Sequence, residues 1–151
     1  MDYYAELDRL IECPVYVIDL LPTAVPDSHA GFYGKAERWF SSKREYKRLY
    51  RKFLRLLLKL GCYCDLTVSH GLKWEENPSP KRLEQLVEKC TGGRKDYLNI
   101  LVDHSRAMVI LNGDDLYLSV YGPDLRLRHL LQELAASEGL FFWKPPIPEQ
   151  Q

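Results

Sequence analysis

The feature that most constrains the fold is a long amphipathic helix predicted over residues 42–60. Ser42 and Glu45 have the spacing of a capping box, in which the Ser42 side chain accepts a hydrogen bond from the Glu45 amide and the Glu45 side chain reaches back. Gly61 is expected to end the helix in the left-handed conformation. Apolar residues recur at three- and four-residue steps and share one side of the helix, namely Tyr46, Leu49, Tyr50, Phe53, Leu54, Leu57 and Leu60. This side needs a second apolar layer to cover it.

Short apolar segments elsewhere in the chain can supply that layer as β-strands. Strands are predicted where β-branched and aromatic residues alternate with polar ones or form dense runs, at residues 15–21, 62–68, 97–103, 107–111, 116–121 and 140–143. Residues 32–40 are ambiguous, and we favour a strand there. Asn112-Gly113 predicts a hairpin turn because both residues tolerate positive φ. Residues 23–31 and 71–78 are expected to be loops.

Three further helices are predicted between these strands. Residues 3–12 carry apolar positions at helical spacing. Ser79 and Pro80 predict the start of a helix that ends at Gly92-Gly93, because Ser caps a helix well and Pro suits its first turn. Asp124 is expected to cap the last helix, and Gly139 to close it.

The interleaving of these helices and strands predicts an α+β fold. We expect a mixed, largely antiparallel sheet of five to seven strands, with three or four amphipathic helices packed mainly on one face. Residues 1–144 are expected to form a single domain, because 151 residues suit one hydrophobic core. Residues 145–151 read as an extended C-terminal tail.

Composition excludes several classes of protein. The 21 Lys and Arg residues balance 21 Asp and Glu residues, whereas a protein built mainly to coat nucleic acid is usually basic. The least polar stretch, residues 13–26, is broken by Pro14, Asp19 and Pro22, so no membrane span is expected. The first residues do not resemble a secretory signal, so we expect a cytoplasmic protein whose four cysteines are free thiols.

The cysteines invite a metal-site interpretation that their spacing does not favour. Cys62 and Cys64, with His70 and Cys90 as further ligands, could be combined into a site. Structural zinc sites mostly use two cysteines separated by two residues on a tight turn. We therefore expect core cysteines, with Cys62 and Cys64 on the apolar side of a strand, and we expect no metal and no cofactor.

Other polar motifs are better explained as turns than as catalytic or metal sites. Asp103-His104-Ser105 has the residue types of a hydrolase triad, but adjacent residues cannot converge as a triad requires. Asp114-Asp115 lacks the rest of a calcium loop. Asp19 interrupts an apolar run, and a buried carboxylate must be paired or have a shifted pKa, so it remains a weak site candidate. One hypothesis is therefore a small enzyme that assembles a site from Asp19, Asp65, His70 and His104.

The polar side of the helix at 42–60 carries the clearest surface signal. At 100° per residue, six cations fall on one side opposite the leucines, namely Arg44, Arg48, Arg51, Lys52, Arg55 and Lys59. We call these six residues the basic strip. Residues 43–59 hold eight cations and one acid, whereas the first forty residues hold seven acids and three cations. The strip could be a solvated face neutralised by the acidic N-terminal region or a neighbouring subunit, a binding surface for an acidic partner, or a membrane-surface helix.

The best functional hypothesis from sequence is a non-catalytic interaction or regulatory domain that binds a protein partner or itself. Its motivation is the segregated charge and the aromatic residues that could line an interface, namely Trp39, Trp74, Tyr117, Tyr121 and Trp143. The alternative is nucleic-acid binding through the basic helix 42–60, which predicts affinity that falls steeply with salt. The small enzyme is the second alternative.

Overall fold

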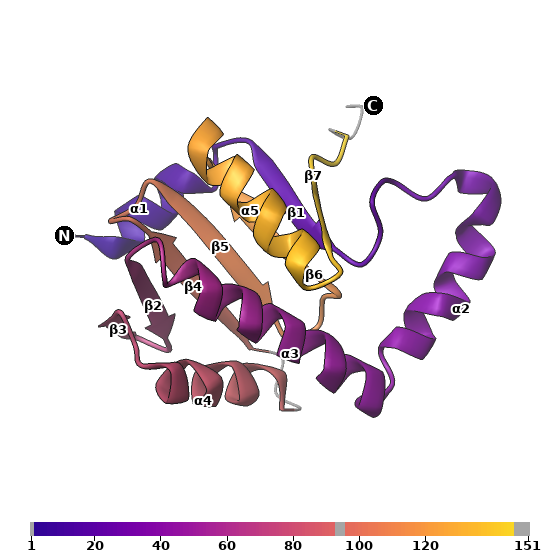
Figure 1. Ribbon diagram of the computed structural model, residues 1–151, viewed down its shortest axis with the longest axis horizontal. Coiled ribbons are helices and arrows are strands. Elements are labelled where there is room, and N and C mark those ends of the chain that lie inside the picture. Colours follow the sequence, from indigo (N-terminus) through magenta and orange to yellow (C-terminus); the bar gives the residue numbers. More distant parts are fainter. Residues whose placement is uncertain (1, 93–95, 147–151) are drawn as a thin grey trace.

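The computed structural model describes residues 2–92 and 96–146, which form a seven-stranded antiparallel sheet and five α-helices. The strand order across the sheet is β3-β2-β4-β5-β6-β1-β7, and every strand pair is antiparallel (Figure 1). The strands are β1 (Val15–Asp19), β2 (Leu66–His70), β3 (Lys73–Glu76), β4 (Tyr97–Val102), β5 (Ala107–Asn112), β6 (Tyr117–Tyr121) and β7 (Phe141–Trp143). The helices are α1 (Tyr3–Leu10), α2 (Ala30–Phe40), α3 (Lys43–Leu60), α4 (Pro80–Thr91) and α5 (Leu125–Ser137), and a short 3₁₀ turn, η1 (Asp27–His29), precedes α2. The predicted α+β class is confirmed.

Three helices cover one face of the sheet and create the main core. α3, α4 and α5 lie side by side on this face (Figure 1). The apolar side of α3 is buried as its periodicity predicts, with Phe53, Leu56, Leu57 and Leu60 fully enclosed. Strand residues that point to this face alternate with residues that point away, as the pleat requires, so Ile18, Leu118 and Val120 belong to this core.

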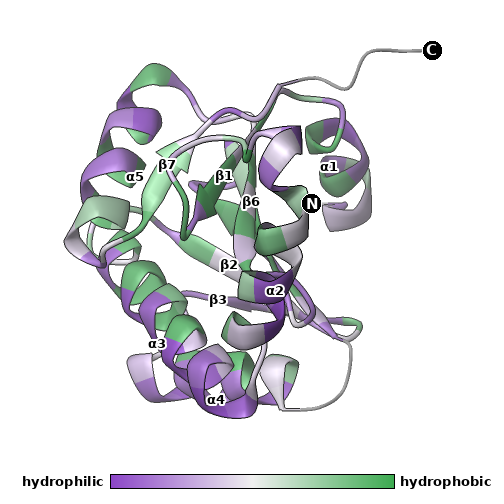
Figure 2. Cartoon of the chain, turned by 90° about the vertical axis from the view of Figure 1, so that its right-hand side faces the viewer, coloured by the Kyte–Doolittle hydropathy of each residue, from purple (hydrophilic) through white to green (hydrophobic). Residues whose placement is uncertain are grey.

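The opposite face of the sheet is only half covered. α1 packs there through a small cluster around Leu10, Leu101 and Met108, and Figure 2 shows α1 across the sheet from α3 and α5. The cluster reaches Tyr121 on β6. Among the described residues, no helix packs flat on the part of this face formed by β1, β6 and β7, and a pocket opens there.

α2 stands apart from both layers. Among the residues that the structure describes, this helix buries none of its own, and its main contacts are with η1 and α3. Figure 1 shows α2 at the right of the molecule, held between the long connection from β1 and the start of α3. The prediction of a strand at 32–40 is wrong. Phe32, Ala36 and Phe40 recur every four residues, a helical period that a short, aromatic-rich segment obscures.

The segment around Cys62 also differs from the prediction. The strand expected at 62–68 begins only at Leu66, because the amides of Cys62 and Cys64 bond to Lys59 and Leu60 carbonyls and extend the last turn of α3. The loop expected at 71–78 contains β3, which pairs with β2 across a turn at Gly71 with φ +59°. The alternation of apolar residues begins at Cys62, inside the last turn of α3, so the sequence placed the start of β2 too early. It gave no signal for β3.

The helix ends show which capping predictions hold. Ser79 and Asp124 accept the backbone amides of Arg82 and Leu127, at 3.1 and 2.8 Å, as expected. Ser42 precedes α3 but makes no side-chain cap bond. Two glycines at helix ends behave differently. Gly139 adopts φ +72° after α5, whereas Gly61 has φ −61° and does not provide the expected left-handed stop.

Pro145 and Pro146 follow β7 without regular structure, and the rest of the predicted tail, 147–151, lies outside the described residues, as does Gly93.

Candidate functional site

The basic strip runs along the side of α3 that faces away from the sheet. Its arginines are exposed and its lysines are partly exposed. Arg55 lies against the end of α5, where its Nε donates to Glu138 Oε1 at 2.6 Å. Lys59 Nζ lies 3.6 Å from the other carboxylate oxygen of Glu138 and donates to Ser137 Oγ at 2.9 Å. The Glu138 side chain is only 4% exposed, so a nearly buried carboxylate holds two cations of the strip.

The other strip residues divide into paired and unpaired groups. Arg51 lies 3.7 Å from Glu84 of α4, and Arg48 lies 3.5 Å from Glu45 within α3. Within residues 2–92 and 96–146, Arg44 and Lys52 have no ion-pair partner. The recorded partners come from α3, α4 and the end of α5, rather than from the acidic N-terminal region that the sequence suggested. The strip therefore carries less uncompensated charge than its composition implies.

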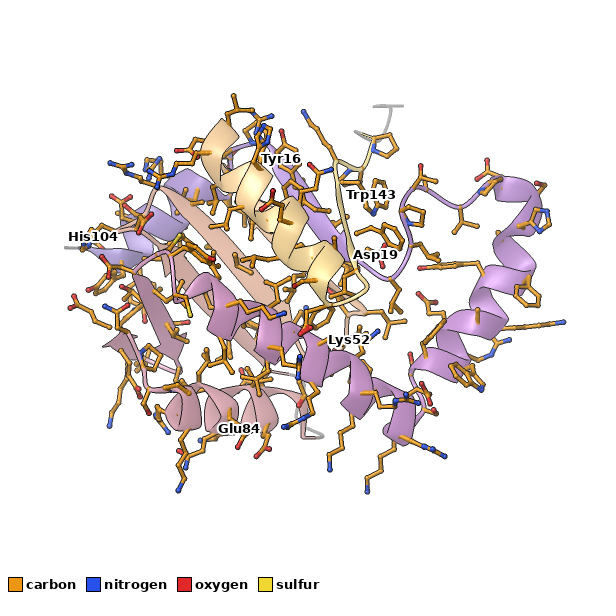
Figure 3. The ribbon with its side chains drawn as sticks, viewed as in Figure 1. Tyr16, Asp19, Lys52, Glu84, His104 and Trp143 are labelled. Carbon is orange, nitrogen blue, oxygen red and sulfur yellow. The ribbon has the colours of Figure 1, made fainter. Side chains whose placement is uncertain are left out.

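The four residues of the hypothetical scattered enzyme site do not meet in one pocket. His104 Nε2 lies 3.7 Å from Asp65 Oδ2, with both side chains more than half exposed. His70 Nε2 instead lies 3.1 Å from Lys89 Nζ. Figure 3 shows His104 at the left edge of the molecule, far from Asp19, which lies to the right of its centre. Asp19 lines a pocket that includes none of the other three residues, so these four groups do not meet around one substrate.

The cysteines occupy three different environments. Cys90 is buried on α4, as predicted, and burial raises the pKa of its thiol to about 12. Cys64 is half-buried, and burial raises its pKa to about 11. Cys62 is exposed in the turn after α3, so the prediction that it faces the core is wrong. No group of three or more potential metal ligands occurs in the described part of the chain.

The Asp103-His104-Ser105 tripeptide forms the predicted turn between two strands, β4 and β5. All three residues have positive φ, and Asp103 Oδ1 accepts the Asp65 amide at 2.9 Å. Asp and His adopt positive φ in turns more readily than most residues. The tripeptide therefore has a structural explanation.

The uncovered half of the sheet forms the floor of a pocket of about 540 Å³. Cross-strand pairs build this floor, since Asp19 lies opposite Tyr117, Val17 lies between Ser119 and Trp143, and Val15 lies opposite Tyr121. The walls are the 21–25 connection and the first turns of α2. We call this the β1 pocket, and its lining consists of Val15, Val17, Asp19, Leu21, Thr23, Ala24, Val25, Ala30, Tyr33, Tyr117, Ser119, Tyr121, Trp143 and Pro145.

Asp19 is the one charged residue in this lining. It ends β1, and its carboxylate accepts the Leu20 amide at 2.7 Å. No Lys, Arg or His of the described residues forms an ion pair with it. Burial raises the pKa of the Asp19 carboxyl, and the backbone amides of Leu20 and Leu21 partly oppose that rise. A half-buried carboxylate without a cation is an unusual arrangement for a residue that only supports a fold.

Aromatic residues line the pocket on either side of its floor, and Tyr117 lies directly opposite Asp19, whereas Tyr121 lies at the far end, opposite Val15. Tyr33 comes from α2, Tyr117 and Tyr121 from β6, and Trp143 from β7. Figure 3 shows Asp19 and Trp143 on the side of the body that faces α2. Burial raises the pKa of Tyr33, with Glu37 and Asp19 as further causes.

Two further groups add to the polarity of this region. Burial raises the pKa of Tyr117, and the Asp115 carboxylate adds to that rise. The indole N–H of Trp143 is buried and has no acceptor among the described residues. The pocket therefore combines aromatic surface with negative charge.

A second unpartnered surface lies on α2 itself. Five apolar residues fall within about 120° of the helix circumference at 100° per residue, namely Phe32, Tyr33, Ala36, Trp39 and Phe40. We call these residues the α2 stripe. Phe32 is 72% exposed, Trp39 is 58% exposed and Tyr33 is 38% exposed. Figure 2 shows hydrophobic and hydrophilic residues alternating around this helix.

Sequence reasoning missed most of this region. The interface aromatics it named include Trp39, Tyr117, Tyr121 and Trp143, but it placed Trp39 in a strand and did not connect the others with Asp19. The helical spacing of Phe32, Ala36 and Phe40 could have identified α2. Nothing local could have shown that β1, β6 and β7 become neighbours, because their pairing joins residues far apart in the chain.

Comparison with known proteins adds no information about function. No protein-family model, no curated protein and no solved structure matches the chain. Among the described residues, no helix combines the length and the apolar character needed to cross a bilayer.

Proposed function

We propose that this protein is a non-catalytic interaction domain that binds a second copy of itself through the α2 stripe. The observation that carries the proposal is that an amphipathic helix buries none of its residues against the described part of its own chain. The apolar side of an amphipathic helix is normally buried against another element. Contiguous exposed apolar patches of this kind are typical of interaction sites.

The intrinsic stability of α2 supports the need for a partner. The helix has 11 residues, and two of them, Gly31 and Gly34, disfavour the helical state. Each glycine costs about 1 kcal/mol relative to alanine, and helices shorter than about 12–15 residues are marginal in water. The body of the chain supplies little packing in compensation, so contacts from outside would stabilise the helix.

The exposed area suits a weak dimer. Aromatic side chains present about 150–250 Å² each, so the exposed parts of Phe32, Tyr33 and Trp39 amount to roughly 350 Å² per copy. Two stripes in contact would bury roughly 700 Å², which is below the roughly 1,200 Å² of stable interfaces. Association itself costs about 4–15 kcal/mol, so we expect a dimer that forms only at high protein concentration.

The charge distribution favours a second copy over a charged macromolecule. The polar side of α2 carries Lys35, Glu37 and Arg38, which do not select a strongly acidic or basic partner. The whole chain has zero formal net charge, which weakens repulsion between copies. A symmetric dimer uses the same patch on both subunits, and the α2 stripe is present on every copy. Much of the basic strip, by contrast, is already paired within the chain.

Analytical ultracentrifugation over a wide range of protein concentration tests the proposal. The wild-type protein should shift from monomer to dimer as concentration rises. A Phe32→Ser/Trp39→Ser variant should remain monomeric at concentrations where the wild type is mostly dimeric, because both exposed aromatic anchors are lost. Since neither side chain is buried, its circular dichroism spectrum should keep the signal of the remaining helices and the sheet.

A variant at a different exposed apolar residue provides the matched control. Leu72 is 88% exposed in the turn between β2 and β3, away from α2, so Leu72→Ser should leave dimerisation unchanged. A wild-type protein that stays monomeric throughout would overturn the proposal. So would a dimer that Leu72→Ser weakens as much as the α2 variant does.

A further inference from the structure

We propose that the β1 pocket binds a small organic ammonium ion, with Asp19 as the counter-ion and Tyr33, Tyr117 and Trp143 as the aromatic cage. The site shares Tyr33 with the α2 stripe, but its floor and its charged residue lie on the sheet, so we expect binding in the monomer. The proposal stands on three properties of the pocket, which are its shape, its charge and its lining. Each property depends on residues that come from different helices and strands.

The shape of the pocket suits a ligand of low molecular weight. Its volume of about 540 Å³ lies within the range of about 300–1,000 Å³ that is usual for small-molecule sites. Its floor is a paired part of the sheet, so the residues on β1, β6 and β7 are held by backbone hydrogen bonds. Its mouth is bounded by the start of α2 and the 21–25 connection.

The charge of the pocket selects a cation. Asp19 is its one charged lining residue, and Glu37 and Asp115 lie close enough to influence Tyr33 and Tyr117 at its rim. The nearby cation Lys144 lies over the ring of Tyr16, which belongs to the opposite face of the sheet. An anionic ligand would meet uncompensated carboxylates in a partly desolvated place, which is strongly unfavourable. A metal ion would find one carboxylate, too few ligands for a specific site.

The lining selects an organic cation over an inorganic one. Tyr33, Tyr117 and Trp143 contribute aromatic rings from three different elements to the part of the lining nearest Asp19. A cation over an aromatic face gains about 0.5–2 kcal/mol per favourable ring, and quaternary ammonium groups are commonly bound by such cages. Val15 and Val17 add apolar surface for methyl or methylene groups. The combination of one carboxylate, three aromatic rings and apolar floor residues therefore matches an alkylated ammonium ion.

Choline and its neutral isostere 3,3-dimethylbutan-1-ol form a matched pair of probes. The two molecules share shape and hydroxyl group but differ in charge. Choline should bind with a dissociation constant of about 0.1–10 mM, and the neutral isostere should bind at least about tenfold more weakly. Binding can be followed by the fluorescence of Trp143 in a Trp39→Phe/Trp74→Phe background, which leaves Trp143 as the one tryptophan of the sequence.

Two variants separate the role of Asp19 from general effects of charge. Asp19→Asn keeps an acceptor for the Leu20 amide but removes the negative charge, so choline affinity should fall at least about tenfold. Asp27→Asn removes a carboxylate from η1, outside the pocket lining, and should leave the affinity unchanged within about twofold. Circular dichroism of both variants checks that they remain folded.

The outcomes distinguish this proposal from the self-association proposal. The Phe32→Ser/Trp39→Ser variant retains every residue of the pocket lining, so it should bind choline, with an affinity measured calorimetrically, even when it is monomeric. Equal binding of choline and the neutral isostere would overturn the ammonium site. So would a folded wild-type protein that binds neither probe, or an Asp19→Asn variant that binds choline like the wild type.

Discussion

At the scale of single residues, Glu138 explains much of what the basic strip does within the fold. Its side chain is 4% exposed, yet it is a carboxylate at the end of α5. Arg55 and Lys59 supply the two cations that such a group needs. A nearly buried carboxylate left without partners is strongly destabilising, whereas an exposed arginine is not. Part of the strip therefore supports the contact between α3 and α5.

Arg55→Ala should lower the free energy of unfolding by about 1–2 kcal/mol, because it removes the closest partner of Glu138 while Lys59 remains. Urea denaturation measures the difference. Arg44→Ala, at an exposed strip residue without an ion pair among the described residues, should change stability by less than about 0.5 kcal/mol. Equal effects of the two substitutions would show that the Glu138 pair contributes nothing specific.

Asp19→Asn should make the protein more stable at pH 7 and have little effect near pH 4. Burial raises the carboxyl pKa above its ordinary value of 3.8, so the folded state favours the protonated acid. The wild type therefore loses stability as pH rises from the ordinary pKa through the raised one, and asparagine does not. Urea midpoints of both proteins at pH 4 and pH 7 measure this. Hydrogen bonds from Arg9 and Arg82 are the main causes that lower the pKa values of Glu6 and Glu75. These two carboxyls affect the pH dependence of stability equally in the wild type and in the variant. A variant less stable than wild type at pH 7 would contradict the assignment of Asp19 as a desolvated carboxylate.

At the scale of elements, the hairpin between β5 and β6 shows how a correct prediction can rest on a different cause. The chain turns directly after Asn112, the last residue of β5, and reaches β6 at Tyr117, but neither Asn112 nor Gly113 has the positive φ on which the prediction rested. Gly113 is needed there for a close approach, since a Cβ would lie 2.4 Å from the Cys90 carbonyl oxygen. Two tyrosines of α3 hold the turn, because the Tyr46 hydroxyl donates to the Gly113 carbonyl and the Tyr50 hydroxyl lies 2.7 Å from the Asn112 carbonyl oxygen.

Gly113→Ala should therefore destabilise the protein by about 1–3 kcal/mol, because backbone at Cys90 or in the turn must move to admit the methyl group. Gly31→Ala is the matched control. An added Cβ at Gly31 meets nothing within 4 Å, and alanine favours the helix, so this change should be neutral or stabilising by up to about 1 kcal/mol. Thermal unfolding of both variants measures the contrast. A Gly113→Ala variant as stable as Gly31→Ala would contradict the close approach.

The elements also show why sequence predicted some parts of the structure and not others. The period of α3 and the caps Ser79 and Asp124 are local signals with strong physical causes, and their elements were found. α2 was mistaken for a strand because a clear helical period normally comes from one buried apolar side. Among the described residues, this helix has no buried residue. Cys62 was misplaced because the end of α3 continues one turn past Leu60.

At the scale of the whole molecule, the two faces of the sheet have different roles. α3, α4 and α5 cover one face and hold the main core, and the fold class could be predicted from their apolar stripes. The other face carries α1 over one half and the β1 pocket over the other. The pocket could not be predicted, since it depends on β1 pairing with both β6 and β7 across the length of the chain. The candidate sites therefore lie where long-range pairing leaves surface uncovered.

In the proposed dimer, α2 of one copy meets α2 of another. Site-directed cross-linking tests both the partner and the surface. Ala36 lies at the centre of the α2 stripe, whereas Arg38 lies on the opposite side of the same helix. In a Cys62→Ser background, which removes an exposed thiol, Ala36→Cys should give covalent dimers with a short thiol-specific cross-linker, and Arg38→Cys should not. Equal cross-linking of the two variants would contradict an α2–α2 dimer. So would the absence of cross-linking from Ala36→Cys at concentrations where a dimer sediments.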